Sequence, residues 1–460
     1  MAKHSDNRSV DIVVVGGGTA GSFAAATAAD AGLDVVLLER KSESEAGRIA
    51  CGDAIKGKST FPDVINIDYL KEESFTNQRI RRAIFENPYE NQELEVEFGR
   101  SGSVIDRKRY GEVLLEEAQR LGVTIEYNTV VTEVCQEGEQ ICGIRAKQNG
   151  DPITYNADIT IDAAGALSVL QDTADFSKST FDTNVRYSQF CSAYREVIEV
   201  PEPIDWADAI KFKPTTELGY LWYFPRSKRE INVGLGFQMT EEPIQLVETL
   251  KRDLHNQPVF DGATVKNKLG AALPTRRPYD SAVAPGYMAV GDAAAHVNPA
   301  TGGGIGGAAK AGHWAAKAAI EAIAMDDISE QALWDYNHKV MTGFGSRFAV
   351  IDLYNIWGTA YDIETLSEIV ASLPGQQLAD AVGGSGTPSM GLGLKLKTIA
   401  STFGHWSELY ELYQIRKIAN RLADHYTVFP TKSESFHQWQ RKRDAIMSDF
   451  YDVCGAQQKY

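Results

Sequence analysis

The sequence predicts an α/β protein built from a Rossmann-like nucleotide-binding domain, an inserted antiparallel β-sheet and a mostly helical C-terminal region. Three observations indicate this fold class. A glycine-rich turn follows the apolar run at residues 12–15, a β-rich stretch over residues 185–236 interrupts the nucleotide-binding pattern, and helical periodicity dominates from residue 331 onward. The length of 460 residues exceeds what one compact core holds, so two or three domains are expected.

The glycine-rich turn is the strongest single signal, because it lies between a strand and a helix. The motif Gly-x-Gly-x-x-Gly at residues 16–21 leads into an Ala-rich helix over residues 22–31 and a second apolar strand over residues 34–38, which ends on Glu39. Such a unit binds a dinucleotide. Two glycines let the backbone approach a pyrophosphate, the third packs helix on strand, and the acid accepts hydrogen bonds from a ribose. The glycines are Gly16, Gly18 and Gly21.

The following segment continues this pattern. Polar and apolar residues alternate over residues 94–98, and Asp106-Arg107 precedes an amphipathic helix over residues 111–121. Further strands, expected to form a meander that ends at Asp162-Ala-Ala-Gly165, cover residues 124–127, 130–134, 141–147 and 157–163.

The β-rich stretch predicts an inserted sheet that forms a β-sheet substrate-binding domain. Its expected strands cover residues 186–194, 220–225 and 231–237, with a helix over residues 242–254. The predicted division is a nucleotide-binding domain of residues 1–70, 100–184 and 270–335, a β-sheet domain of residues 71–99 and 185–269, and a helical domain of residues 336–460.

The nucleotide-binding pattern returns late in the chain. A short apolar strand ends on Gly291-Asp292, a glycine run follows at residues 302–304, and an Ala-rich helix is expected over residues 308–325. Because the glycine run lies between a strand and a helix start, its backbone amides can point at an anion or an electron-rich ring.

The C-terminal region carries no sharp motif. A Gly/Pro-rich break at residues 383–393 separates it from expected amphipathic helices over residues 394–405 and 408–422. Aromatic residues at helical spacing are more often core than ligand wall. We therefore expect a core role for Phe403, Trp406, Tyr410 and Tyr413.

Composition limits the possible partners. The formal net charge of -16 disfavours a nucleic-acid partner, and no polybasic patch marks a lipid surface. Five cysteines without a Cys-x-x-Cys pair favour a reducing cytoplasm, and we predict no metal site. The first ten residues lack the apolar core of a signal peptide, and no apolar run is long enough to span a bilayer. Peripheral contact with a membrane stays open.

Taken together, the motifs resemble a known group of flavoproteins. The early glycine turn with Glu39, the middle Asp106-Arg107 and the late Gly291-Asp292 resemble the p-hydroxybenzoate hydroxylase superfamily. The run Tyr-Leu-Trp-Tyr-Phe-Pro at residues 220–225, followed by Asn-Val-Gly-Leu-Gly at residues 232–236, is similar to the signature of the geranylgeranyl reductase family, of the archaeal lipid-reducing type. Cys51-Gly52 matches that family's cysteine loop.

The resemblance implies FAD as the cofactor. It implies contacts at Glu39 for the adenosine ribose, at Arg107 for the pyrophosphate and at Asp292 for the ribityl chain. Val131 is expected to give a backbone contact near the adenine, and Cys51 is expected at the flavin. The expected cofactor contacts are completed by Gly16, Gly18, Ala20, Gly21, Arg40, Gly52, Gly303, Gly304 and Ile305.

The implied reaction is saturation of isoprenoid double bonds in geranylgeranyl chains of a prenyl lipid or prenyl diphosphate. Tyr220, Trp222 and Phe224 alternate on a strand, so they face one side and offer an apolar wall for the substrate. Cys51 is a tentative catalytic proton donor. The hydroxylase relatives carry an Asp-Gly doublet where this chain has Asp162-Ala-Ala-Gly165, which leaves the electron donor open among NADPH, ferredoxin or another reductant.

Two other functions stay open at this point. A flavin-dependent halogenase or hydroxylase is one, because residues 220–225 are also close to the halogenases' Trp-x-Trp-x-Ile-Pro. A non-catalytic prenyl-binding escort with a related nucleotide fold is the other. The intact glycine turn, Glu39 and Asp292 speak against a degenerate escort.

Overall fold

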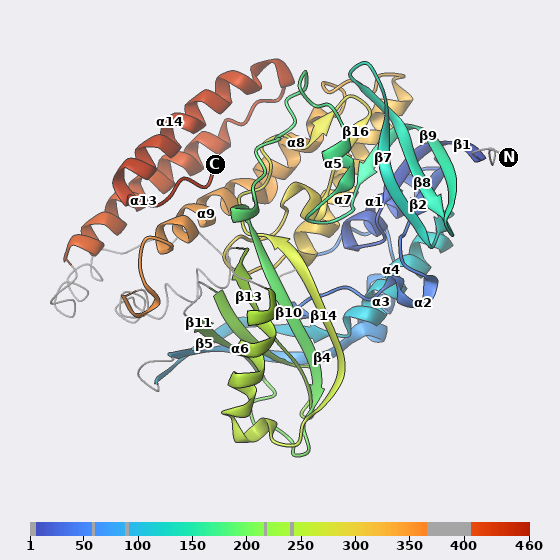
Figure 1. The fold of residues 1–460 in the computed structure, drawn as a ribbon. Coiled ribbons are helices and arrows are strands. Elements are labelled where there is room, and N and C mark those ends of the chain that lie inside the picture. The colour runs from blue at the N-terminus through green and yellow to red at the C-terminus, as the bar shows by residue number, and fades with distance from the viewer. Residues whose placement is uncertain (1–5, 58–59, 88–91, 216–218, 240–242, 366–405) are drawn as a thin grey trace.

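The structure, a computed structural model, describes residues 6–57, 60–87, 92–215, 219–239, 243–365 and 406–460. Figure 1 shows the nucleotide-binding part at the upper right, the second sheet with α6 at the bottom, and the C-terminal helices α13 and α14 at the upper left. This arrangement confirms the predicted fold class of a Rossmann-like domain, a second sheet and a helical C-terminal region. None of the helices in the described ranges combines the length and the apolar character needed to cross a membrane.

The first sheet forms the nucleotide-binding part. Its order is β15-β16-β9-β1-β2-β6, and β1 pairs in parallel with both β2 and β9. The strands β7 and β8 extend β9 as the predicted antiparallel meander. The strand over residues 124–126, which we expected in that meander, instead pairs in parallel with β2. The bounds are β1 (Asp6–Val15), β2 (Val35–Leu38), β6 (Thr124–Glu126), β7 (Thr129–Glu137), β8 (Gln140–Gln148), β9 (Asp151–Asp162), β15 (Val283–Ala284) and β16 (Tyr287–Ala289).

Helices cover this sheet with small residues that permit close packing. A Cβ on Gly312 of α7 would lie 2.1 Å from the Ala20 carbonyl oxygen of α1, so the two helices touch at their backbones. The helices of this part are α1 (Thr19–Asp30), α2 (Glu43–Ala46), α3 (Ile67–Ser74), α4 (Arg107–Arg120), α5 (Val169–Thr173), η3 (Gly291–Ala294) and α7 (Ile305–Ala324).

The second sheet has the order β14-β10-β13-β12-β11-β4-β5-β3. Its pairs are antiparallel except for β11 with β4, which is parallel. One face packs on α6 around its own apolar core. The bounds are β3 (Ala54–Ile55), β4 (Phe75–Asn87), β5 (Gln92–Ile105), η1 (Tyr187–Gln189), β10 (Phe190–Glu199), β11 (Ala209–Thr215), β12 (Gly219–Pro225), β13 (Glu230–Gln238), α6 (Pro243–His255), η2 (Pro258–Phe260) and β14 (Thr264–Pro274).

Within residues 334–365 and 406–460, the C-terminal region packs helices and a π-turn against the nucleotide-binding part, and shares its core. The π-turn η4 (Met341–Gly345) joins α8 to α9. The predicted break at residues 383–393 and the predicted helix over residues 394–405 lie outside the described residues. The helices are α8 (Trp334–Val340), α9 (Ser346–Gly358), α13 (Trp406–Thr427), η5 (Ser433–Ser435) and α14 (Phe436–Cys454).

The sequence analysis did not assign several elements, among them α3, β4, β11 and β14. β14 is an edge strand of its sheet, and only its last residue, Pro274, is buried, so no run of buried apolar residues marks it. The pairing of β4 with β5 contains several register shifts, which break the period of two. The second sheet therefore begins at β3 and ends at Pro274, and is wider than the sequence pattern indicates.

Candidate functional site

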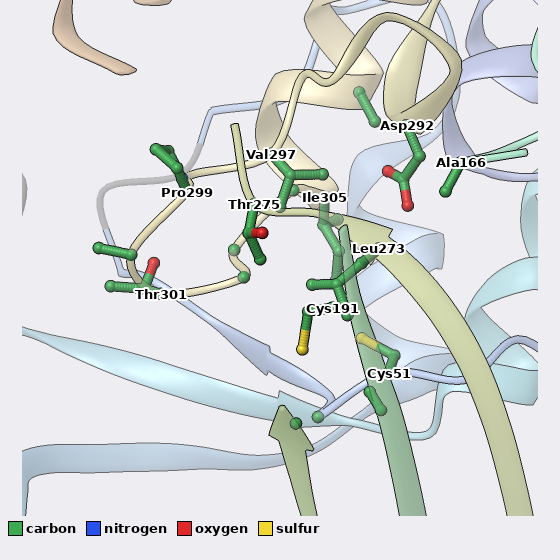
Figure 2. Close-up of a pocket in the computed structure, with 18 of the residues that line it drawn as sticks. Cys51, Ala166, Cys191, Leu273, Thr275, Asp292, Val297, Pro299, Thr301 and Ile305 are labelled. Atoms are coloured by element: carbon green, nitrogen blue, oxygen red, sulfur yellow. The ribbon is translucent and has the colours of Figure 1, made fainter. Parts of the chain in front are cut away.

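One cavity of about 2700 Å³ lies where the two sheets and the C-terminal helices meet. Its lining comes from the glycine turn, from strands of the second sheet, and from α9 and α13. Figure 2 shows Cys51, Asp292 and Ile305, which come from distant parts of the chain, around this space. A pocket for one small ligand measures roughly 300–1,000 Å³, so the cavity has room for a nucleotide cofactor and a second ligand.

The glycine turn between β1 and α1 leaves no room for a side chain at two positions. Gly16 has a φ of +106°, and a Cβ there would lie 2.4 Å from the Ala163 carbonyl oxygen. A Cβ on Gly21 would lie 2.0 Å from the Gly16 carbonyl oxygen. At Gly18, by contrast, a Cβ would meet only the Ile49 side chain, at 3.9 Å. The backbone at Gly18 thus borders open space at the N-terminus of α1, where a pyrophosphate would gain hydrogen bonds and a favourable dipole.

Glu39 follows β2 and is held by the backbone around it. Its buried carboxylate accepts hydrogen bonds from the N–H groups of Gly17, at 3.0 Å, and Lys41, at 2.9 Å. Each carboxylate oxygen keeps a further lone pair for a ribose hydroxyl. Arg40 is exposed, Val131 lies on β7, and both line the same cavity. Their roles in cofactor binding stay predictions.

Arg107, the first residue of α4, places an unpaired donor at this end of the cavity. Its side chain is buried, donates to the Thr19 hydroxyl at 3.1 Å and stacks over the Tyr110 ring, 4.9 Å from the centroid. The other terminal nitrogen, Nη1, is buried without a hydrogen-bond partner among the described residues. Leaving a buried cationic donor unpaired costs free energy, and an anionic group in the cavity would remove that cost. Ala20 also lines the cavity.

The late glycine-rich block forms the opposite side of the nucleotide end. Asp292, in η3, lines the cavity, and burial raises its pKa to about 6 although the Arg107 charge lowers it. Gly304 caps α7 and Ile305 is its first residue, so the first N–H groups of this helix lack partners within it. Gly303 lines the cavity beside them in sequence. A carboxylate acceptor and unpaired amide donors therefore face one space.

Asp162 is committed to bonds inside the protein. It is fully buried and accepts hydrogen bonds from the Tyr287 hydroxyl, at 2.6 Å, and from the Ala164 N–H, at 3.0 Å. Burial raises the pKa of this carboxyl group.

The Cys51 loop lies against the aromatic strand β12. The Cys51 sulfur accepts a hydrogen bond from the Asp53 N–H at 3.2 Å, and its carbonyl accepts one from the Asn232 amide at 2.9 Å. A Cβ on Gly52 would lie 2.9 Å from the Phe224 ring, so the loop backbone touches that ring. Burial, and then the Asp53 charge, raise the pKa of the Cys51 thiol. The thiol is therefore protonated at neutral pH.

A buried polar network fixes this loop, and sequence reasoning missed it. Asp53 is fully buried with a φ of +69°, and accepts hydrogen bonds from Arg226 at 2.6 and 3.0 Å. The Asn232 amide donates to the same carboxylate at 2.6 Å, and its carbonyl accepts from the Trp222 indole at 2.9 Å. The network connects the Cys51 loop to the aromatic wall. Its signal in the sequence was the Asn of the Asn-Val-Gly-Leu-Gly block, which we interpreted only as a family feature.

Tyr220, Trp222 and Phe224 lie on one face of β12, as their alternation predicts, and line the cavity. Phe212 of β11 continues this aromatic wall, with ring centroids 5.6 Å from Tyr220 and 5.3 Å from Phe224. The Tyr220 hydroxyl donates to the Thr301 carbonyl at 2.8 Å. The wall is thereby tied to the loop that precedes α7.

The helices α9 and α13 form a second wall, which the sequence did not predict. Tyr410 and Tyr413 are 65% and 47% exposed and line the cavity, so the expectation that they belong to the core is wrong. The side chains of Phe403 and Trp406 lie outside the described residues. From α9, Val350, Tyr354 and Trp357 line the same space. Helical periodicity cannot separate a face turned to a core from a face turned to a cavity.

Three features of this cavity fit a dinucleotide such as FAD. The space at Gly18 accepts a pyrophosphate, the unpaired Arg107 donor accepts its charge, and Asp292 with the start of α7 accepts a polyol chain and a polar ring edge. The sequence profile of the FAD dependent oxidoreductase family matches residues 11–177.

Relatives and solved structures agree with this fit. Digeranylgeranylglycerophospholipid reductase from Sulfolobus acidocaldarius is 27% identical over 96% of this chain and 98% of its own length. The reductase of the same name from Methanoculleus marisnigri is 32% identical over 71% of this chain and 80% of its own length. A geranylgeranyl bacteriochlorophyll reductase-like structure from Thermoplasma acidophilum has a TM-score of 0.72 at 22% identity and covers 90% of this chain and all of its own. A mutant halogenase PltM in complex with FAD has a TM-score of 0.56 at 14% identity, over 95% of this chain and 96% of its own.

Cavity, family profile and relatives together define an FAD-dependent oxidoreductase of the geranylgeranyl reductase type. The chain belongs to the digeranylgeranylglycerophospholipid reductase family. The likeness to the halogenase shows the shared fold alone.

Proposed function

We propose that the protein saturates carbon–carbon double bonds in the geranylgeranyl chains of a prenyl lipid or a prenyl diphosphate. The observation that carries this proposal is the aromatic wall of β12, which opens onto the same cavity as the nucleotide end. A long apolar chain would lie against these rings and reach the cofactor. The names of the relatives support the same substrate class.

Saturation of one alkene consumes two electrons and two protons, as a hydride to one carbon and a proton to the other. FAD in its reduced form supplies the hydride equivalent when bound. The residues of the chain would hold the alkene in place, exclude water and supply the proton. We assign orientation to Tyr220, Trp222 and Phe224, and proton donation to the Cys51 thiol, which lies against the Phe224 ring through Gly52.

The electrons must come from an external donor, for which we propose NADPH, ferredoxin or another low-potential carrier. Five free cysteines suit a reducing cytoplasm. A substrate with long isoprenoid chains resides in a bilayer, so we place the enzyme in the cytoplasm with peripheral contact to a membrane surface.

The test is anaerobic. Dithionite-reduced holoenzyme is mixed with geranylgeranyl diphosphate or a geranylgeranyl glycerolipid, and saturated product is sought by mass spectrometry. We expect product with added hydrogen and no need for oxygen. Turnover only after oxygen is admitted, with a hydroxylated or halogenated product, would instead assign the protein to the hydroxylases or halogenases. A colourless protein that binds prenyl groups would assign it to the escorts.

A further inference from the structure

The cavity lining reverses the charge balance of the chain. The chain has 46 Lys and Arg against 62 Asp and Glu, a net charge of -16. The cavity is lined by ten Lys and Arg side chains and only four carboxylates. Two of those carboxylates, Glu39 and Asp292, lie at the nucleotide end, and a third, Asp53, is paired with Arg226. The surplus of positive charge therefore belongs to the cavity and not to the protein as a whole.

Part of this surplus lies away from the nucleotide end, where Arg107 and the glycine turn already provide for a pyrophosphate. We call the five side chains Lys56, Arg100, Arg347, Arg416 and Lys417 the outer cationic cluster. Glu97 is the carboxylate that lines the cavity in this part of the described chain. A concentration of cations in an otherwise acidic protein points to an anionic ligand.

The members of the outer cationic cluster line one cavity from three parts of the fold, namely β5 with the Lys56-Gly57 turn, α9 and α13. A Cβ on Gly57 would lie 1.9 Å from the Ser101 carbonyl oxygen and 3.3 Å from that of Arg100, so the Lys56-Gly57 turn lies on β5. The positive charge of Arg347, on α9, contributes with burial to a lowered pKa of Lys56. Lys56 and Arg347 therefore line the same cavity and act on one another electrostatically, although 291 positions separate them in the numbering.

The cluster continues from α9 to α13. Tyr354 lies two turns beyond Arg347 on α9, and the charge of Arg416 acts on the Tyr354 hydroxyl, whose pKa burial raises. Lys417 follows Arg416 and lies over the Tyr413 ring, 4.4 Å from its centroid. Among the residues that the structure describes, Arg416 and Lys417 have no carboxylate within salt-bridge distance.

The outer cationic cluster lies at the end of a continuous apolar surface. From Trp222 and Phe224 on β12, the wall passes across β11 at Ile210 and Phe212, across β4 at Ile80 and onto β5 at Phe98. Arg100 is two residues beyond Phe98 on the same strand. A ligand with a long apolar chain and one anionic end matches this succession of surfaces.

We propose that the outer cationic cluster binds the phosphate or diphosphate head group of the prenyl substrate, and that the isoprenoid chain runs from it along the aromatic wall toward the nucleotide end. This inference rests on the proposed function and adds the end by which the substrate is held. It also gives a role to α9 and α13, whose sequences carry no motif.

The experiment compares charged and uncharged ligands of the same chain length. The variant is Arg416→Gln with Lys417→Gln, and the matched control is Arg421→Gln, on the same helix, which pairs with Asp449 and does not line the cavity. Ligand binding to oxidised holoenzyme is followed by the flavin absorbance change, with geranylgeranyl diphosphate, geranylgeraniol and digeranylgeranylglycerophosphate in neutral phosphatidylcholine vesicles. Inorganic pyrophosphate serves as a competitor.

We expect the double variant to weaken binding of an anionic ligand by about ten- to a hundredfold, the usual loss for a charged hydrogen bond. Binding of geranylgeraniol should change less than about twofold, because the alcohol makes no ionic contact. Selective loss for the soluble diphosphate assigns the cluster to a free diphosphate, and selective loss for the vesicle lipid assigns it to a lipid phosphate. Equal losses for alcohol and anion, or no loss at all, would overturn the proposal.

The binding measurement needs no turnover, so the two proposals can fail separately. If wild-type protein prefers the diphosphate over the alcohol but yields no saturated product, the head-group proposal is supported and the proposed reductase function is contradicted. If saturation occurs but the double variant binds the diphosphate like wild type, only the head-group proposal is contradicted. Failure of wild-type protein to bind any prenyl ligand overturns both.

Discussion

The two ends of the cavity are built by different means. At the nucleotide end the backbone provides the surface, through the glycine turn and the N-termini of α1 and α7. At the other end side chains provide it, from the rings of β12 and β11 and from α9 and α13. A backbone surface tolerates no added Cβ at Gly16 or Gly21, whereas a side-chain surface accepts exchange among apolar residues of similar size. The first kind of site leaves a motif in the sequence, and the second leaves only periodicity.

Gly18→Val should have the largest effect, because it fills the backbone-built end. Gly18 has an extended backbone that valine can adopt, and its Cβ would enter the cavity and not the protein interior. We expect a folded but colourless protein, measured as flavin absorbance per protein. Gly99→Val is the control, since Gly99 also lines the cavity, from β5, and a Cβ there meets nothing within 4 Å. A Gly18→Val protein that purifies fully loaded with FAD would contradict the assignment.

Cys51→Ala should lower turnover by about a hundredfold, the lower range for loss of a general acid. Cys51→Ser keeps a poorer donor and should lose less. Because burial raises the pKa of the thiol, the wild-type thiol stays protonated through neutral pH, and the rate should fall only on the alkaline side. Anaerobic single-turnover rates against pH measure this, with FAD content as the control. Near-wild-type rates in both variants would leave the thiol a packing role only.

Trp222→Ala tests the side-chain-built end. Burial of one aromatic side chain is worth about 1.5–3 kcal/mol, so the affinity for a geranylgeranyl ligand should fall by roughly ten- to a hundredfold. Trp222→Phe keeps most of the apolar area and should lose less. Tyr223→Phe, on the opposite face of β12, is the matched control. Unchanged affinity in Trp222→Ala would remove this wall from the substrate site.

Asp292→Asn should separate stability from cofactor binding at the nucleotide end. The pKa of Asp292 is raised from 3.8 to about 6, so the FAD-free protein loses stability as pH rises through this window. At pH 7 the free energy of unfolding of the asparagine variant should therefore exceed that of the wild type by on the order of 1–2 kcal/mol. This figure is reduced to allow for solvent screening of the half-buried carboxylate.

The same Asp292→Asn variant should bind FAD about tenfold more weakly, because a charge-assisted acceptor is lost. Denaturant unfolding at pH 4 and pH 7, and FAD titration of the apoprotein, measure the two effects. A variant that is less stable at pH 7 and binds FAD like wild type would contradict both.

Tyr220→Phe should have the smallest effect, because it removes only the link between the two ends. The lost hydrogen bond to the Thr301 carbonyl is worth about 0.5–1.5 kcal/mol, which corresponds to a roughly two- to tenfold lower kcat/KM. FAD content should not change. If Tyr220→Phe instead lost FAD, the loop before α7 would depend on β12 far more than this single bond implies.

The contrast between the backbone-built end and the side-chain-built end also explains how much of the site the sequence predicts. The glycine turn, Glu39 and the Gly291-Asp292 block lie where their spacing predicts, because each is set by local backbone geometry. Tyr220, Trp222 and Phe224 lie on one face of β12 because side chains alternate between the two faces of a strand. The individual roles of these residues toward FAD and substrate stay predictions.

What the sequence could not predict depends on contacts distant in the chain. Asp53 pairs with Arg226, 173 positions away, and no local pattern indicates such a pair. Tyr410 and Tyr413 have the spacing of a buried helix face, yet they face the cavity. The outer cationic cluster joins β5, α9 and α13 in the same way. Periodicity shows which residues share a face of an element, and only the fold shows what that face meets.

The π-turn η4 between α8 and α9 determines how the chain would respond to the loss of one residue at this point. A π-turn holds one residue more than an α-turn. Thr342 and Gly343 of this turn line the cavity. A Cβ on Gly343 would lie 2.7 Å from the Trp314 ring. Loss of one residue inside a regular helix turns everything beyond it by about 100°. At η4 the same loss would convert the π-turn to α-helix and leave Arg347 and Tyr354 facing the cavity. A one-residue deletion at η4 would therefore preserve the orientation of the wall that α9 contributes to the cavity.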